Sequence, residues 1–172
     1  LRKRIRTMWT ILKFDKKRIE FLKKDFEKNL GKDYKIYRPK LFIQKYKNNK
    51  LIQKEFNLLG DYLLCYHRDF KDPETINKLK FCRGLKYFLT GFIESQKEIE
   101  KFVNKCKSSE TEKGYLSQNF YKLNINSEYK FATGPFVDKI FKIINLQKNR
   151  IDILMGNIKT TIKKQEFLFS PV

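Results

Sequence analysis

The stretch ATGPFVDKI (residues 132–140) contains the only Gly-Pro pair of the chain and separates two segments in which apolar and polar residues alternate. Glycine followed by proline is typical of a tight turn. Around it the sequence predicts five short strands, EYKFAT, KIFKIINL, RIDILM, IKTTIKK and EFLF, with further breaks at 147–149 and at Gly156-Asn157. Five strands in about 50 residues must close on themselves to bury a core, which predicts a five-stranded all-β barrel over residues 123–172.

The residues before this barrel alternate between strand and helix patterns. WTILKF (residues 9–14) predicts a strand, and the next segment predicts a helix with Asp15 as its N-cap and Gly31 at its end. A short extended piece ends at Pro39, and residues 41–56 predict a hairpin with Asn48-Asn49 at its turn. LLGDYLLCYH (residues 58–67) is typical of a buried strand.

Two more helices are predicted in this part. One begins at Asp72-Pro73, and the other at the capping box Ser95–Glu98, with a strand, LKYFLTGF (residues 85–92), between them. The order β-α-β-β-β-α-β-α predicts an α+β domain over residues 8–106, with one mainly antiparallel sheet flanked by helices. Residues 107–122 are polar and aperiodic and predict a linker. Residues 1–7 predict a basic arm, with the folded part beginning at Met8.

The chain is strongly basic: 39 Lys and Arg against 19 Asp and Glu give 172 residues a net charge of +20. Its 41% hydrophobic content, including 16 Phe, indicates a globular protein and not a disordered tail. Such a charge attracts polyanions, nucleic acid first and the ribosome included, although a simply solvated basic surface stays an alternative. No long basic amphipathic helix and no long apolar stretch stands out, so we expect no membrane partner.

The sequence predicts neither a metal site nor an active site. Cys65, Cys82 and Cys106 are widely spaced, and His67 is the only histidine, whereas metal sites need clustered ligands. Reduced, partly buried thiols are the simpler interpretation, and they fit a cytoplasmic protein. No nucleophile with a base beside it and no phosphate-binding glycine loop is recognisable. We therefore expect no catalysis and no cofactor.

Taken together, the pieces resemble the NusG family of transcription elongation factors. LNINSEYKFATGPFVDKIFKIINLQKNRIDILMGNIKTTIKKQEF, which starts at Leu123, is similar to that family's KOW domain, an SH3-like barrel with a "dGPF" turn. Upstream, Trp9 stands at the place of the family's "WY", LLGDYLLCYH resembles "FPGYvlV", and CRGLKYFLTG resembles "trGVsrFvg". The chain departs from the pattern at Lys139, where an aromatic is usual, and at Phe141, where a glycine is usual. It therefore resembles a divergent or RfaH-like paralogue.

The resemblance implies contacts for three groups of residues. Binding to the RNA polymerase clamp, and to the opposite side of its cleft, is implied for Trp9, Leu59, Tyr62, Phe88, Thr75, Ile76 and Asn77, with ordinary core packing as the alternative for the large residues. Contact with upstream or non-template DNA is implied for Lys16, Lys17, Arg18 and Arg83, with a solvated face as the alternative. Binding of a KOW partner, a small-subunit ribosomal protein or Rho, is implied for Phe136, Leu154, Met155 and Gly156.

The resemblance implies a function without catalysis. We expect a monomeric elongation or antitermination factor that bridges the polymerase clamp and contacts nucleic acid. It would be cytoplasmic and associated with the nucleoid or the ribosome. The alternative is a structural, rRNA-binding protein of the ribosome that kept the same architecture, since KOW barrels also occur in ribosomal proteins.

Overall fold

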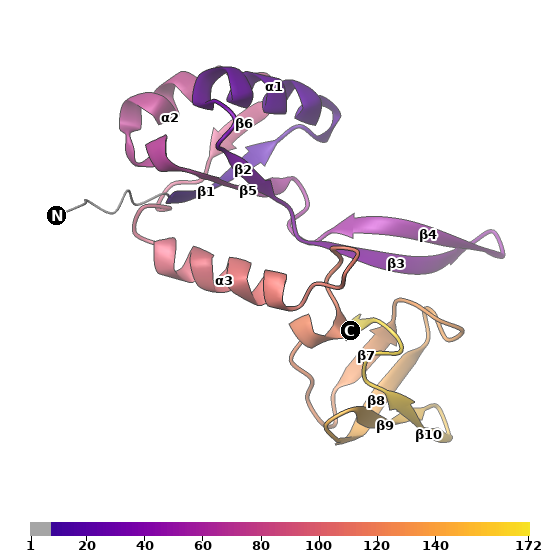
Figure 1. Cartoon of the computed structure of the whole chain (residues 1–172). Helices are drawn as coiled ribbons and strands as arrows, with labels where there is room; N and C mark the ends of the chain where they lie inside the picture. The colour runs from indigo at the N-terminus through magenta and orange to yellow at the C-terminus, as the bar shows by residue number, and fades with distance from the viewer. Residues whose placement is uncertain (1–7) are drawn as a thin grey trace. The chain divides into compact units, whose positions relative to one another are not determined.

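A computed structural model describes residues 8–172 (Figure 1). The predicted basic arm, residues 1–7, lies outside the described residues. Contacts divide the chain into two compact units. The N-terminal unit comprises the residues up to Pro39 together with Leu58–Asn104, and the C-terminal unit comprises Lys40–Asn57 together with Lys105–Val172. The predicted boundaries at 8–106, 107–122 and 123–172 remain a prediction.

The N-terminal unit is built on a four-stranded antiparallel sheet with the order β2-β5-β1-β6. Its strands are β1 (Met8–Phe14), β2 (Lys35–Tyr37), β5 (Tyr62–His67) and β6 (Leu85–Phe88). Its helical segments are η1 (Lys16–Arg18), α1 (Ile19–Leu30), η2 (Arg68–Lys71), α2 (Pro73–Leu79) and α3 (Gln96–Ser108), the last of which continues beyond the unit's boundary at Asn104. The mixture of helices and antiparallel strands confirms the predicted α+β class.

Both faces of this sheet carry apolar side chains. On one face Leu12 and Phe14 pack with Leu22 and Phe26 of α1. On the other face Trp9 and Leu64 pack with Ile99 and Val103 of α3. Successive strand residues point to opposite faces, so β1 serves both layers. Gln96 fastens α3 to β1, because its side chain accepts from the Trp9 amide at 2.9 Å and donates to the Trp9 carbonyl at 2.8 Å.

The helix ends follow the predicted local signals. The Asp15 side chain accepts a hydrogen bond from the Lys17 amide at 3.0 Å, and Gly31 stands at the end of α1 with a φ of 77°. Asp72 caps α2 through the Glu74 amide, with Pro73 as the first helical residue. These bonds satisfy amides that have no partner inside the helix. The predicted helix start at Asp72 is thereby confirmed, whereas Asp15 caps η1, a 3-10 turn that leads into α1 at Ile19.

The predicted hairpin exists, but it does not join the main sheet. Strands β3 (Lys40–Lys47) and β4 (Lys50–Asn57) pair only with each other, and Asn48 and Asn49 form the turn with φ values of 50° and 58°. The expectation of a single sheet before residue 107 is therefore wrong. At the base of the hairpin the Leu58 amide donates to the Pro39 carbonyl at 2.9 Å, which closes the ribbon on itself.

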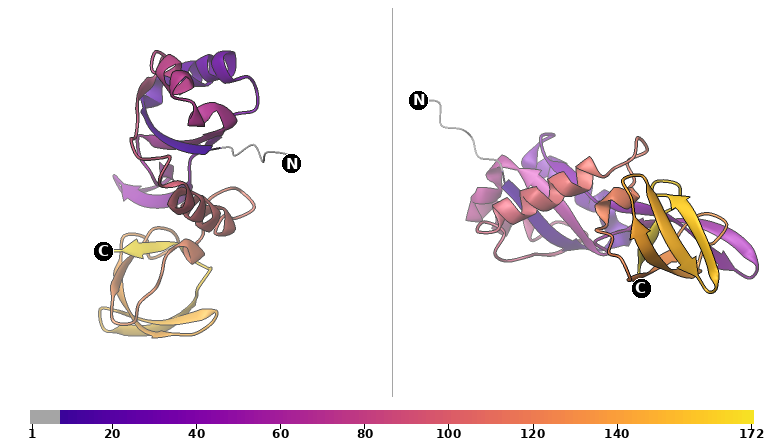
Figure 2. Two further views of the ribbon diagram at one scale, coloured as in Figure 1. Left: turned by 90° about the vertical axis from the view of Figure 1, so that its left-hand side faces the viewer. Right: turned by 90° about the horizontal axis from the view of Figure 1, so that it is seen from below.

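The C-terminal unit contains a five-stranded antiparallel sheet with the order β10-β9-β8-β7-β11. Its strands are β7 (Glu128–Phe131), β8 (Ile140–Leu146), β9 (Arg150–Met155), β10 (Ile158–Lys163) and β11 (Phe169–Pro171). Four of the five predicted strands are present at their predicted places, whereas the fifth, predicted at residues 166–169, corresponds to β11 and begins only at Phe169. Figure 2 shows the sheet curled around its inner face. Four aromatic rings lie in this core, those of Tyr129, Phe131, Phe141 and Phe169. Phe141 is 4.4 Å from Phe131 and 5.1 Å from Phe169 between ring centroids, so the residue that departs from the family pattern lies within the core.

The stretch at residues 132–140 is the turn between β7 and β8, as predicted. Gly134 has a φ of 87°, and a Cβ atom at this position would collide with the ring of Phe167. Glycine is therefore required by the backbone conformation and by the close approach of the ring. The Gly134 amide donates to Oε1 of Gln44 at 2.9 Å, and the Gln44 amide donates to the Ala132 carbonyl at 2.6 Å. The turn is thus held by the middle of β3.

The predicted linker, residues 107–122, begins with the last two residues of α3 and contains η3 (Gln118–Phe120), and the rest of it is irregular but anchored. An isolated bridge joins Glu110 to Leu116 around a turn that contains Gly114. The Leu116 side chain is buried, and its amide donates to the Lys40 carbonyl at 2.8 Å. The polar composition predicted the irregular backbone, whereas the anchoring depends on tertiary contacts.

Candidate functional site

The sheet of the N-terminal unit exposes two tyrosines on the face that α3 covers in part. The hydroxyl groups of Tyr62 and Tyr87 lie 3.2 Å apart, and this hydrogen bond raises the pKa of Tyr62. The ammonium of Lys13 lies 5.5 Å from the centroid of one ring and 5.9 Å from that of the other. We name Lys13, Tyr62 and Tyr87 the tyrosine surface. Because two aromatic rings and a cation are held together at the surface, they offer a preformed contact for a protein partner.

The other predicted polymerase contacts lie in different environments. Trp9 is buried on the same face under α3, with its ring centroid 4.9 Å from that of Tyr66. Leu59 is half-buried against the same cluster. Phe88 points to the opposite face, where it packs against Phe70 at 6.2 Å. The structure therefore brings Leu59 and Tyr62 to one side of the sheet and Phe88 to the other, and Tyr87 takes the position beside Tyr62 that we expected for Phe88.

Thr75, Ile76 and Asn77 lie within helix α2. The Thr75 hydroxyl donates to Oδ2 of Asp72 at 3.1 Å and so belongs to the helix cap. Ile76 packs against the core of the N-terminal unit, and Asn77 is exposed. Only Asn77 of the three thus presents an unobstructed side chain.

The predicted nucleic-acid residues lie on two segments that contact each other. Lys16, Lys17 and Arg18 form η1, and the loop before β6 lies against it. The Asp15 amide donates to the Gly84 carbonyl at 2.8 Å, and a Cβ atom at Gly84 would lie 2.7 Å from the Arg18 carbonyl oxygen. Glycine at position 84 is what allows this approach. We name Lys17, Arg18, Phe81 and Arg83 the basic loop surface.

Two of the predicted nucleic-acid residues, Arg83 and Lys16, already form ion pairs with carboxylates. The Arg83 guanidinium binds both oxygens of Asp25, at 2.7 and 3.1 Å, and lies 4.8 Å from the centroid of the Phe21 ring. These bonds hold the pKa of Asp25 at about 2. Lys16 pairs with Asp61 at 3.1 Å and lowers the pKa of that carboxyl. Lys17 and Arg18 have no such ion pair among the described residues, so they are the better phosphate ligands of the predicted set.

Phe81, which has 90% of its surface exposed, is not among the site residues predicted from the sequence. It follows the last turn of α2, where Leu79 and Cys82 turn inward. An isolated apolar residue at the surface is ordinary, but a phenylalanine this exposed, two positions before Arg83, offers a ring on which a base can stack. Its exposure can be read from its place in the sequence. Ile76 and Leu79, at helical spacing, mark the side that faces the core, and residue 81 falls on another side.

The predicted KOW-partner residues lie in two turns. Phe136 is at the border between half-buried and exposed, with its ring 5.8 Å from that of Phe131. Leu154 and Met155 end β9 and are half-buried, and Gly156 begins the turn to β10 with a φ of 58°. Lys139 points outward, while its carbonyl accepts from the Phe131 amide at 3.0 Å. Phe136 is the one aromatic residue of this set.

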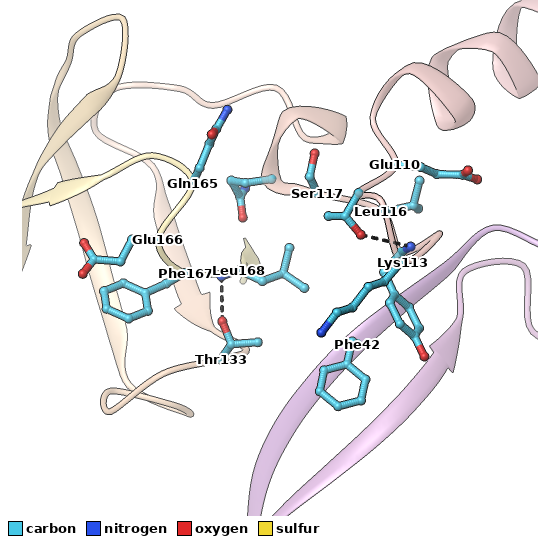
Figure 3. A pocket seen from close by; sticks show the side chains of 13 residues that line it. Phe42, Glu110, Lys113, Leu116, Ser117, Thr133, Gln165, Glu166, Phe167 and Leu168 are labelled. Carbon is cyan, nitrogen blue, oxygen red and sulfur yellow. Dashed lines mark hydrogen bonds between the residues drawn. The ribbon is translucent and has the colours of Figure 1, made fainter.

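A groove of about 730 Å³ lies within the C-terminal unit (Figure 3). Phe42, Leu116, Phe167 and Leu168 supply its apolar walls, and Lys113 is also among the residues that line it. The Leu168 amide donates to the Thr133 hydroxyl at 2.8 Å, which the figure marks with a dashed line. None of the residues that line the groove is a histidine or a cysteine.

The cysteines and the histidine lie in the protein interior. Burial raises the pKa of Cys65 to about 12 and that of Cys82 to about 11, and Cys106 is buried as well. His67 is buried, and its Nδ1 accepts from the Asp69 amide at 3.2 Å. Over residues 8–172 no three metal-ligating side chains come together. No helix in this range is long and apolar enough to cross a membrane.

Comparisons with known proteins gave structural similarities only. No protein-family model matches the sequence, and no curated protein matches it. Among solved structures, one of Thermotoga maritima NusG, concerned with domain interaction, aligns with a TM-score of 0.34 at 14% identity over 94% of this chain and 96% of that chain. A crystal structure of the MjSpt4:Spt5 complex aligns with a TM-score of 0.30 at 13% identity over 97% of this chain and 98% of that chain.

Proposed function

We propose that this chain is a non-enzymatic transcription elongation or antitermination factor that binds RNA polymerase and nucleic acid. The observation that carries the proposal is the tyrosine surface, which lies on the strands that carry the NusG-like motifs. Tyr62 stands at the motif's tyrosine, and Tyr87 falls within CRGLKYFLTG. Without this exposed surface, core packing alone would explain the residues of these motifs.

The tyrosine surface has the properties of an anchoring contact. Tyr87 is 46% exposed, and Tyr62 is half-buried, so both rings can lose surface to a partner. Their mutual hydrogen bond and the ammonium of Lys13 fix the rings before binding, which lowers the entropy lost on association. Tyrosine is among the residues that most often dominate interface energy. Leu59, half-buried on the same face, would extend the contact.

The basic loop surface would guide nucleic acid beside the polymerase. Lys17 and Arg18 would contact phosphates, and Phe81 would stack on an unpaired base of the non-template strand. Arg83 is paired with Asp25, so it would help to position the nucleic acid more than it would add net positive charge. In this mechanism the protein does no chemistry. Contacts on both sides of the cleft, with Asn77 as the exposed residue of α2, would favour the closed clamp and suppress pausing.

The C-terminal unit would be a KOW barrel that tethers a second partner. Its curved five-stranded sheet and its GPF turn support this assignment. Phe136 and the residues Leu154–Gly156 would form the contact with a ribosomal protein or Rho. The exposed Lys139, at a position where the family has an aromatic, would make this contact more polar than in other members.

Binding to purified RNA polymerase core enzyme tests the proposal. The double variant Tyr62→Ala/Tyr87→Ala removes both rings and is expected to weaken binding by roughly 30-fold, since hot-spot residues contribute about 2 kcal/mol or more. Tyr46→Ala is the matched control, because it removes a tyrosine of similar exposure from the hairpin. Small ribosomal subunits form the second arm of the assay.

Two results would contradict the polymerase contact. One is equal polymerase binding by the double variant and the control. The other is binding to ribosomal subunits with none to polymerase, which would favour the structural rRNA-binding alternative. Trp9 fluorescence in each variant verifies that the N-terminal unit is folded, because Trp9 is the only tryptophan and is buried there.

A further inference from the structure

The register of the hairpin places four lysines on one face of the ribbon. In an antiparallel pair, residues directly opposite each other point to the same side, and side chains alternate along each strand. Lys47 is opposite Lys50, Lys45 is opposite Ile52, and Ile43 is opposite Lys54. We name this side the lysine face: Lys45, Lys47, Lys50, Ile52, Lys54 and Phe56.

The lysine face has no internal counter-charge. Every residue from Lys45 to Phe56 is exposed, and none of the four lysines makes an ion pair with another described residue. The one carboxylate of the ribbon, Glu55, lies on the other face, where it binds Lys40 at 3.2 Å and the Tyr115 hydroxyl at 2.9 Å. Like charges directly opposite in a sheet are destabilising, so the pair Lys47 and Lys50 weakens the isolated ribbon. An external polyanion would relieve this repulsion.

An exposed ring lies on the same side, at the base of the ribbon. Phe56 is opposite Leu41 and keeps 47% of its surface exposed. It lines a pocket of about 310 Å³ together with Leu41, Ile43 and Tyr121, and Lys45 and Lys130 lie among the lining residues. Asp138 is the one carboxylate of this lining. An apolar pocket flanked by cations accepts a flat aromatic group that carries a negative charge nearby.

The opposite side of the ribbon differs in character. Tyr46 is paired with Leu51, and Gln44 is paired with Gln53. This side holds the Gly134 amide through Gln44 and carries no lysine between Lys40 and the turn. The four lysines are therefore confined to one face of the ribbon and are not spread evenly over its surface.

We propose that the lysine face binds single-stranded nucleic acid, with phosphates on the four lysines and one unpaired base against Phe56 in the pocket. Proteins that bind single strands combine a basic track for the backbone with aromatic rings for the bases, and both elements occur here on one face. A lipid surface or an acidic protein could bind the lysines, but neither would fill the separate pocket beside Phe56. The site is distinct from the basic loop surface of the N-terminal unit and does not rest on polymerase binding.

Fluorescence anisotropy with labelled oligo-dT and oligo-rU on the full chain tests this site. The variant Lys45→Gln/Lys47→Gln/Lys50→Gln/Lys54→Gln is expected to reduce the salt dependence, d log K/d log[salt], by about 2.8, at about 0.7 per phosphate contact. The control variant Lys122→Gln/Lys142→Gln/Lys159→Gln/Lys163→Gln removes the same charge from exposed positions elsewhere in the C-terminal unit. Phe56→Ala is expected to weaken binding of single strands roughly 5- to 100-fold and to leave binding of a blunt duplex unchanged.

Several results would overturn the proposal. Equal loss in the hairpin variant and the control variant would show that only net charge matters. An unchanged affinity of Phe56→Ala for both oligonucleotides would exclude the pocket. Binding of the wild type to anionic lipid vesicles in place of oligonucleotides, abolished in the hairpin variant, would assign the lysine face to a membrane surface. A preference for oligo-dT or for oligo-rU supports the site in either case and identifies its ligand.

Discussion

Replacing Gly134 by alanine is expected to destabilise the C-terminal unit through two separate effects. The backbone at this position has a φ of 87°. This conformation costs a residue that has a Cβ atom about 1–2 kcal/mol. The new methyl group would also collide with the ring of Phe167, and overpacking of this kind costs about 1–3 kcal/mol. Together the loss in the free energy of unfolding is about 2–5 kcal/mol, a large fraction of the stability of a small unit.

Gly156→Ala separates the two effects. Gly156 has a φ of 58°, and nothing lies within 4 Å of the position of its Cβ. This variant therefore carries the backbone effect without the collision and is expected to lose about 1–2 kcal/mol. The variant Phe167→Leu provides a background that lacks the ring that the methyl group meets. The cost of Gly134→Ala measured in that background should fall toward the cost of Gly156→Ala.

The assay must report each unit separately. Isoleucine methyl NMR during urea unfolding follows the C-terminal unit, because Ile143, Ile151, Ile153 and Ile162 are buried in its core. Trp9 fluorescence follows the N-terminal unit, which should unfold at an unchanged urea concentration. Equal losses for Gly134→Ala and Gly156→Ala, with no coupling to Phe167, would refute the collision and with it the close-packed turn at residues 132–140.

Two further predictions concern the N-terminal unit. Phe81→Ala is expected to weaken binding of a forked duplex with a single-stranded arm roughly 5- to 100-fold without changing thermal stability, since the ring is almost fully exposed; unchanged affinity would remove Phe81 from the site. For Asp25, the pKa falls from 3.8 to about 2 on folding, so its contribution is present above pH 3.8 and is lost as the pH falls toward 2. The stability difference between wild type and Asp25→Asn, read by Trp9 fluorescence, should therefore shrink over that range, and a constant difference would contradict the pairing with Arg83.

Local signals predicted the elements well because each depends on a few neighbouring residues. Asp15 and Asp72 cap helices, and Asn48 and Asn49 adopt positive φ, as side-chain chemistry near the backbone dictates. The sheet to which the hairpin belongs was not predictable. Residues 41–56 alternate, but both sides of the ribbon carry apolar residues, so the pattern does not specify which surface they meet.

The candidate sites were predictable only in part, for a related reason. Tyr87 and Phe88 are adjacent in a strand, so one of them must face α1 and α2 and the other must lie on the face that α3 covers in part. The family motif directed attention to Phe88, and the register with Lys13 places Tyr87 beside Tyr62. Which of two neighbours faces the core depends on strand pairing across many residues of sequence. That information is absent from the short motif.

The net charge of +20 becomes informative only when the partners of individual cations are known. Arg83 and Lys16, which the family pattern marks for nucleic acid, are paired with Asp25 and Asp61. The four lysines of the lysine face make no ion pair with another described residue, and one pair of them, Lys47 and Lys50, lies directly opposite in the ribbon. A cation with an internal partner must release it or share it before it gains from a phosphate, whereas an unpaired one gains at once. The strongest electrostatic contribution to nucleic-acid binding should therefore come from the four lysines of the hairpin, which the motifs did not indicate, whereas the basic loop surface should contribute through Phe81 and through its two cations that are unpaired within residues 8–172, Lys17 and Arg18.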